Sequence, residues 1–217
     1  VKGMHSFLIN NTNNDLTVDN PLIRKGVSST YDYLNNEILF TFLQENNDFT
    51  ISYSELKQQF ISFYDYTPSM YISIGDMLLS TNTTLRSLYK HGVGEYNTFY
   101  GIKYPSYIIF NLNPEPYFDC VFDNINYKSE VYLNNVDQSD ITLTDIQAYN
   151  DYQSTLLTPL VNNRNGNLRR RFRDWNAEIP RDGRNRIRGP WIKLKVQFNN
   201  ESNYKLILHD MIISYTV

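Results

Sequence analysis

Hydrophobic and polar side chains alternate along several segments of the chain, and this alternation predicts β-strands. In FTISYS at 49–54, Phe, Ile and Tyr occupy every second position, with Thr and Ser between them. The preceding segment ILFTFL at 38–43 places Ile38, Phe40 and Phe42 on one face. A period of two residues is typical of a strand that is buried on one face. We therefore expect two paired strands whose aromatic face packs into a core.

Further short strands and tight turns follow up to about residue 101. QFISFYDYTP at 59–68 favours a third strand, and MYISIGDMLLSTN at 70–82 favours two strands joined by a turn at Gly75 and Asp76. Consecutive short strands of this kind form an antiparallel meander, like one blade of a β-propeller. The chain holds no second convincing copy of this pattern. We therefore assign residues 1–112 to a propeller-blade-like meander, with most of any propeller outside this chain.

One segment of the meander has a competing interpretation. In SELKQQFISFY at 54–64, Leu56, Phe60 and Phe63 stand at positions i, i+4 and i+7. That spacing places three apolar side chains on one face of an amphipathic helix. The pattern alone leaves strand and helix both open here.

A second β-rich part follows the proline-containing segment NLNPEPYFD at 111–119. The segment FDCVFDNINYKSEVYL at 118–133 resembles a long strand. In PWIKLKVQF at 190–198, four apolar side chains alternate with Lys and Gln, which is the clearest strand pattern in the chain. The segment YKLILHDMIISYTV at 204–217 predicts a returning strand. We therefore expect residues 113–217 to form a C-terminal β-sandwich.

The composition supports a mainly β fold with many turns. The chain has 18 Tyr and 12 Phe but only two Ala and as many as 27 Asn. Aromatic residues suit the surface of a sheet, Ala is the best helix former, and Asn is common in turns. No run of about 18 apolar residues is present, so the sequence predicts no membrane span.

The sequence offers little catalytic chemistry. His5, His91 and His209 are scattered without metal-ligand spacing, and we expect His209 to be a structural or interface residue within a strand. The single Cys120 cannot form a disulfide within the chain, and we expect a buried thiol. Signatures of nucleotide binding, of serine hydrolases and of zinc proteases are missing. We therefore predict no catalytic residue, no metal site, no cofactor and no enzymatic activity.

Arginine is concentrated in one segment, which is the most informative feature of the chain. Residues 164–188 contain nine of the eleven arginines, no lysine and only three acids, which gives a formal charge of about +6. The whole chain carries −3, so the remainder is acidic. The nine arginines are Arg164, Arg169, Arg170, Arg171, Arg173, Arg181, Arg184, Arg186 and Arg188. Their concentration makes the segment the candidate functional site.

Three interpretations of this arginine-rich segment remain open. It forms a solvated loop, contacts nucleic-acid phosphates, or packs against acidic faces of the same or a neighbouring subunit. We favour the third, because Arg offers a planar fork of donors for carboxylates and because solvated charged loops usually also contain Lys. The nine arginines are therefore predicted to line a subunit interface or a channel.

The segment is also predicted to be anchored by apolar side chains. We expect RRRFRDWNAEI at 169–179 to be strand-like, with Trp175, Ala177 and Ile179 on one buried face. Because side chains alternate along a strand, other residues then point outward. Those predicted for the outer face are Arg170, Phe172 and Asp174.

Several ordered motifs together resemble a known family. They are ILFTFLQ at 38–44, the meander up to FYG at 99–101, FDNI at 122–125, and a tail from RFRDWNAEIPRDGRNRIRGPWIKLKVQF to NYKLILHDMIISYTV. In this order they resemble the C-terminal part of the tail muzzle (stabilisation or nozzle) protein of crAss-like bacteriophages. The resemblance covers the chain from about Ser29 to Val217.

The resemblance implies a structural role in the virion. It implies a large multi-domain protein in a ring of subunits, with six-fold symmetry, at the distal end of a short tail on the path of DNA ejection. The implied partners are other muzzle subunits, the N-terminal portion of the same protein, adjacent tail ring or fibre proteins and, transiently, phage DNA. From a different class, a receptor- or carbohydrate-binding β module of a phage tail remains the alternative.

Overall fold

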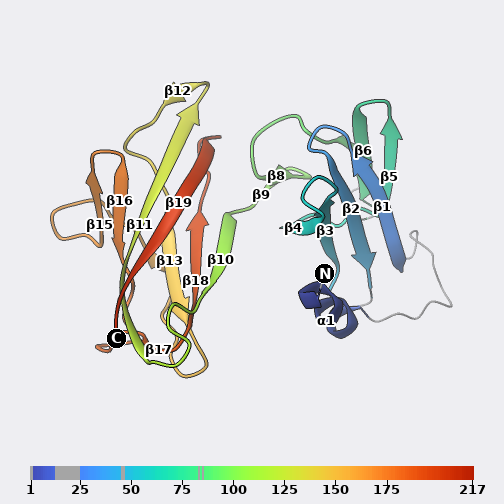
Figure 1. Cartoon of the computed structure of the whole chain (residues 1–217). Coiled ribbons are helices and arrows are strands. Elements are labelled where there is room, and N and C mark those ends of the chain that lie inside the picture. Colours follow the sequence, from blue (N-terminus) through green and yellow to red (C-terminus); the bar gives the residue numbers. More distant parts are fainter. Residues whose placement is uncertain (1, 13–24, 45–46, 83, 85) are drawn as a thin grey trace. The chain divides into compact units, whose positions relative to one another are not determined.

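The computed structural model describes residues 2–12, 25–44, 47–82, 84 and 86–217, and it is mainly β (Figure 1). The chain divides into two compact units, which are described separately. Unit 1 comprises residues 1–94 and 98–102, and unit 2 comprises residues 95–97 and 103–217. The mainly β prediction is confirmed, while the finer descriptions as a propeller blade and a sandwich stay predictions. The predicted division after residue 112 also stays a prediction.

Unit 1 contains a four-stranded antiparallel meander in the order β1-β2-β3-β4. Its strands are β1 (Gly26–Asp32), β2 (Glu37–Leu43), β3 (Phe49–Ser54) and β4 (Gln59–Tyr64). The helical alternative for 54–64 is wrong, because β4 pairs with β3 over this stretch. Leu56, one of the three residues with helical spacing, is exposed in the turn between these strands and buries no apolar face.

A second sheet of unit 1 contains β5 (Met70–Ile74), β6 (Met77–Asn82) and β7 (Ser87–Lys90). The predicted turn between β5 and β6 is confirmed, and Gly75 adopts a φ of 62°, which glycine reaches without a steric penalty. A short hairpin follows, formed by β8 (Thr98–Phe99) and β9 (Ile102–Lys103).

Hydroxyl groups form hydrogen bonds inside unit 1, and the one between Thr41 on β2 and Tyr71 on β5 joins its two sheets. Thr41 and Thr50 are buried, and their hydroxyl oxygens lie 2.8 Å apart. The Thr41 hydroxyl also lies 2.7 Å from the hydroxyl of Tyr71 on β5. The Ser80 hydroxyl on β6 contacts the Tyr100 hydroxyl at 2.8 Å and His91 Nε2 at 2.6 Å. The hydroxyl groups of Thr41, Thr50 and Ser80 each have a partner, which reduces the desolvation penalty of burying them.

The expectation that the aromatic side of β3 packs into a core is confirmed in part, because Ile51 on that side is 1% exposed, and the opposite side is buried as well. Phe49 and Tyr53 are only half-buried, whereas Thr50 between them is fully buried. The aromatic side packs beneath helix α1 (Lys2–Asn11), a helix that was not predicted from the sequence. The Phe7 ring of α1 makes edge contacts with the rings of Phe49 and Phe63, at centroid distances of 5.6 and 5.3 Å.

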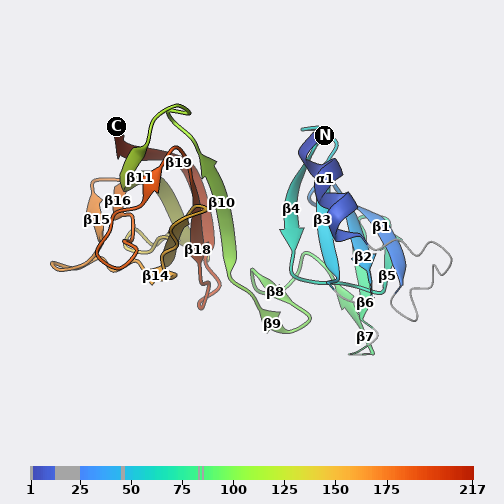
Figure 2. The same ribbon diagram turned by 90° about the horizontal axis from the view of Figure 1, so that it is seen from below.

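Unit 2 contains two antiparallel sheets whose apolar faces share one core (Figure 2). The first sheet has the order β10-β18-β13-β14. Its strands are β10 (Ser106–Leu112), β13 (Asp145–Tyr149), β14 (Thr158–Pro159) and β18 (Ile192–Phe198). The predicted alternation along β18 is confirmed, because Ile192, Leu194 and Val196 are buried. Although β10 precedes residue 113, it pairs with β18 and belongs to unit 2.

The second sheet is built around the long strand β11 (Cys120–Leu133). Its other strands are β12 (Val136–Asp137), β15 (Leu168–Arg171), β16 (Asp174–Glu178), β17 (Arg188–Gly189) and β19 (Lys205–Thr216). β19 pairs along almost the whole of β11, so the predicted returning strand at the end of the chain is confirmed. Cys120 is fully buried in this unit, as predicted. Among the described residues, no helix is long and apolar enough to span a membrane.

Candidate functional site

The arginine-rich segment contains a β-hairpin, formed by β15 and β16 and here called the arginine hairpin (residues 168–178). Its apolar side chains hold it to the core of unit 2. Leu168 pairs with Ala177 across the hairpin, and both are buried beside Trp175, which is 2% exposed. The prediction that Trp175, Ala177 and Ile179 share a buried face is confirmed. The hairpin is thus fixed on one side and presents its other side to solvent.

The predicted outer face is wrong in part, because 169–179 is a hairpin and not one strand. The chain turns at Phe172, whose φ is 58°, and Arg170 consequently pairs with Trp175 on the same side of the sheet. The Arg170 guanidinium lies over the Trp175 ring, 5.6 Å from its centroid. Cross-strand pairs share a face in any hairpin, so the turn reverses the alternation that a continuous strand would show. Asp174 does lie on the exposed face.

Arg170 links the hairpin to a neighbouring segment. Its Nη1 donates to Asp140 Oδ1 at 3.0 Å, and its Nε donates to the Phe172 carbonyl oxygen at 3.0 Å. One guanidinium therefore contacts an indole ring, a carboxylate and the backbone of the turn. These contacts restrict the conformation of the tip of the hairpin.

Charges alternate across the outer face of the sheet that contains the hairpin. Arg171 on β15 is the cross-strand neighbour of Asp174 on β16. Asp174 in turn neighbours Lys128 on β11, and Lys128 neighbours Asp210 on β19. Lys128 Nζ lies 3.9 Å from Asp174 and 3.6 Å from Asp210. In the next row, Arg169 stands at the edge of the sheet and is exposed. The ion pairs found among the described residues include neither Arg169 nor Arg171.

A second group of arginines surrounds Asp123, near the start of β11. Arg186 Nη1 donates to Asp123 Oδ1 at 2.6 Å, and Arg181 Nη2 lies 3.6 Å from Glu178 Oε1. These four side chains line a cavity of about 380 Å³ whose lining includes Thr216 of β19. The guanidinium groups of Arg181 and Arg186 are thus already paired within unit 2.

The backbone of this second group is held by two amide side chains. Gln153 Oε1 accepts from the Arg188 amide at 2.8 Å, and Gln153 Nε2 donates to the Arg186 carbonyl oxygen at 3.2 Å. Asn150 Nδ2 donates to the Arg188 carbonyl oxygen at 2.9 Å. These bonds fix the path of the chain into β17.

The nine arginines therefore do not form one continuous patch. Figure 1 shows β17 and β12 at opposite ends of unit 2, and the turn of the arginine hairpin is on the side of β12. Four arginines, Arg169, Arg170, Arg171 and Arg173, lie on the hairpin. Arg181, Arg184, Arg186 and Arg188 lie between β16 and β18, and Arg164 is exposed in the loop before β15.

A cavity beside the hairpin brings together residues that the sequence analysis did not connect. It measures about 450 Å³, and its lining includes Glu130, Tyr132, Arg173 and His209. The Tyr132 hydroxyl donates to Glu130 Oε2 at 2.8 Å, and His209 Nε2 lies 3.4 Å from Glu130 Oε1. The hydrogen bond from Tyr132 lowers the pKa of Glu130, and the charges of His209 and Arg173 act in the same direction.

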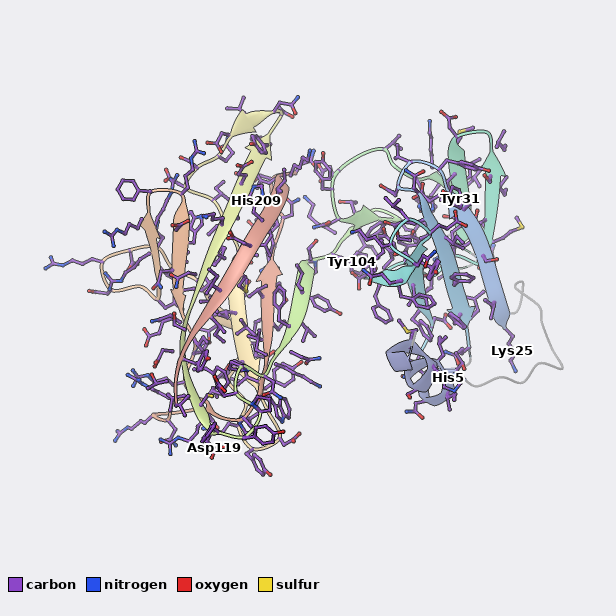
Figure 3. All side chains as sticks on the ribbon, viewed as in Figure 1. His5, Lys25, Tyr31, Tyr104, Asp119 and His209 are labelled. Carbon is purple, nitrogen blue, oxygen red and sulfur yellow. The ribbon has the colours of Figure 1, made fainter. Side chains whose placement is uncertain are left out.

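These cavity residues could not be grouped from the sequence, because Glu130 and His209 are far apart along the chain. The pairing of β11 with β19 brings them together. Figure 3 shows His209 on β19, alongside β11. Its side chain is half-exposed, and its role as a structural or interface histidine stays a prediction. Within the part of the chain that the structure describes, no three His, Cys, Asp or Glu side chains are grouped as metal ligands.

Comparisons with known proteins match both parts of the chain. A family model described as Crassvirus muzzle protein matches residues 1–84, and one described as Crassvirus muzzle protein C-terminal domain matches residues 94–182. The muzzle protein of Bacteroides phage crAss001 is 31% identical over 194 residues. That alignment covers 86% of this chain but only 14% of the phage protein, so the chain spans about one seventh of its relative's length.

Proposed function

The chain belongs to the muzzle protein family of crAss-like bacteriophages, and from this premise we propose its function. It forms part of a ring of subunits at the distal end of the tail, on the path of DNA ejection. Members of this family are structural proteins of the virion tail, and this chain is a component of that tail. Its proposed partners are neighbouring copies of the same protein, the N-terminal portion of the polypeptide and adjacent tail proteins.

Within this ring, the arginine hairpin makes the contact with a neighbouring subunit. The observation that carries the proposal is that Arg169 and Arg171 are exposed on a hairpin whose other side is locked into the core. The hairpin is rigid, and its outward guanidinium groups are available to carboxylates. Guanidinium forks bind carboxylates through two parallel hydrogen bonds, which fixes orientation as well as providing attraction.

The free energy that ion pairs of these arginines contribute depends on whether the pairs are buried in an interface. A solvent-exposed ion pair contributes about 0–1 kcal/mol, whereas removal of one partner from a buried, hydrogen-bonded pair costs roughly 3–5 kcal/mol. Arg169 and Arg171 are therefore nearly neutral for the fold of unit 2 and decisive for assembly. Arg186 differs, because its partner Asp123 lies in the same unit.

Substitution of Arg169 and Arg171 by alanine in the full-length muzzle protein of the phage tests this proposal. We expect the double variant to fold normally but to give few complete tails, since the unpaired carboxylates of the neighbour remain buried. Lysine at both positions restores assembly only in part, because it lacks the planar fork. Particle yield by electron microscopy and circular dichroism of the purified chain are the measurements.

Arg164→Ala is the matched control, since this exposed arginine stands in a loop outside the hairpin. It is expected to leave particle yield unchanged. Normal assembly of the double alanine variant with defective DNA release would place these arginines along the DNA path. Normal assembly and normal release would contradict any role for the hairpin.

A receptor- or carbohydrate-binding module is the second candidate function. The cavity of about 450 Å³ favours it, because Tyr132, Glu130 and Arg173 line one concave surface with an aromatic ring and polar groups of both charges. Binding of the isolated chain to a glycan array, abolished by Tyr132→Ala, would favour this function over the ring contact.

A further inference from the structure

Phe172 occupies an unusual position at the tip of the arginine hairpin. Its side chain is 86% exposed, and its φ of 58° lies in the left-handed region. A bulky residue is disfavoured in that region, and glycine is the usual choice in tight hairpin turns. Neither packing within unit 2 nor backbone preference therefore explains a phenylalanine here. Residues held in such conformations are found preferentially at functional sites.

Contacts within unit 2 restrict the conformation of the tip. The Phe172 carbonyl oxygen accepts a hydrogen bond from Arg170 Nε, and the same guanidinium is bound by Asp140 and covers Trp175. Trp175 is in turn buried in the core. A side chain on a rigid support loses little conformational entropy on binding, which favours its use as an anchor.

The charges beside Phe172 indicate the chemistry of its partner. Arg171 and Arg173 flank it directly, and Arg169 lies two residues before Arg171 on the same strand. An exposed aromatic side chain with arginines on both sides of it in the sequence is complementary to an apolar pocket with carboxylates at its rim. Phe and Arg are both enriched at the centres of protein interfaces, and arginine is frequent among residues that dominate the binding energy.

We propose that Phe172 inserts into an apolar pocket, rimmed by carboxylates, on the neighbouring copy of the muzzle protein, and that it is the anchor of the subunit contact. This inference rests on the proposed ring. It assigns the largest contribution to a residue outside the arginine set and leaves the flanking arginines to orient the tip.

The surroundings of the tip favour a protein partner over a nucleic acid. The row that begins at Arg171 continues with Asp174, Lys128 and Asp210, and Asp140 lies beside Arg170. A bound phosphate backbone would pass close to these carboxylates. Proteins that track single strands use a uniformly positive groove with successive aromatic side chains, and the hairpin offers one ring between charges of both signs.

Two substitutions separate the ring of Phe172 from its backbone conformation. Phe172→Ala removes the ring and keeps the positive φ, whereas Phe172→Gly removes the ring and the steric conflict. In the 217-residue chain, we expect Phe172→Gly to raise Tm on the order of 2 °C relative to Phe172→Ala. In the full-length protein, both variants should lower the yield of assembled tails roughly tenfold or more, while Phe172→Tyr retains most of it. Tyr152→Ala, at an 89% exposed aromatic residue in another loop, is the control expected to assemble normally.

A photo-crosslinking phenylalanine analogue at position 172 of the full-length protein identifies the partner in assembled particles. The expected product is a covalent dimer of muzzle chains, joined at a segment that contains Asp or Glu. A crosslink to DNA or to a different tail protein overturns the proposal, as does normal assembly of Phe172→Ala. If the unsubstituted protein is itself missing from the distal tail of particles, the proposed function fails. If it is present and the Phe172 variants assemble normally, only this inference fails.

Discussion

Replacement of Trp175 by alanine is expected to unfold unit 2 at a markedly lower temperature. Trp175 is 2% exposed and is the largest fully buried side chain in the core, and its ring lies under the Arg170 guanidinium. Truncation of a buried aromatic side chain to alanine costs about 3–5 kcal/mol, because transfer energy is lost and a cavity remains. For a unit of this size, that loss corresponds to a decrease in Tm of roughly 10 °C or more.

Differential scanning calorimetry of the 217-residue chain measures this effect. Only the transition of unit 2 should move, because Trp175 belongs to its core and not to that of unit 1. Trp191→Ala is the matched control, since Trp191 is half-buried and stands outside this core cluster, and we expect a smaller loss. Equal effects of the two substitutions would show that the hairpin is not anchored through Trp175.

Acidification is expected to destabilise unit 1 through His91. Burial lowers the pKa of His91 below its ordinary value, and the negative charge of Asp32 only partly opposes this. His91 Nε2 contacts the Ser80 hydroxyl, and the rings of Tyr66 and Tyr71 lie 5.1 and 6.3 Å from the imidazole. A protonated imidazole would be a poorly solvated charge among these groups.

The direction of this pH effect on the stability of unit 1 follows from proton linkage. Between the lowered pKa of the folded state and the ordinary value of about 6.5, the unfolded chain binds more protons than the folded chain. The stability of unit 1 therefore decreases as the pH falls below about 6.5, by up to about 1.4 kcal/mol per pH unit, and this decrease ends below the folded-state pKa.

Thermal unfolding of the chain at a series of pH values tests this expectation. The series runs from about 7.5 down to about 4.5, which is close to the ordinary pKa of a carboxyl group. His91→Gln should be less stable at neutral pH but should lose most of the pH dependence of the unit 1 transition. If the variant and the unsubstituted chain show the same pH dependence, carboxyl groups and not His91 are responsible.

The strands could be predicted from the sequence where one side chain type marks one face. β18 is the clearest case, because Ile192, Leu194 and Val196 alternate with Lys and Gln. These three apolar side chains are buried in the core. β3 shows the limit of this reasoning. Thr50 is buried because its hydroxyl bonds Thr41 and the Tyr66 carbonyl oxygen, and those partners come from other segments. Local alternation identifies the two faces of a strand but does not show that both are covered, as they are in β3.

The candidate site could be located from the sequence but not subdivided. The density of arginine marked the segment, and the apolar spacing of Trp175 and Ala177 marked its anchored side. The turn at Phe172 was missed because it contains neither glycine nor proline, and the position of Arg170 depends on it. The partner of Arg186 was also not predictable, since Asp123 lies on a strand 63 residues earlier.

The hydroxyl contact between Thr41 and Tyr71 is expected to influence how the two sheets of unit 1 respond to mechanical load. Apolar contacts are non-directional, so two sheets packed only through apolar side chains can slide past each other gradually and form new contacts as they move. The hydrogen bond between Thr41 and Tyr71, which joins the sheets, is 2.7 Å long, and a hydrogen bond is lost once its atoms separate by roughly another ångström. We therefore expect this contact between the sheets to resist small displacements and then to break abruptly.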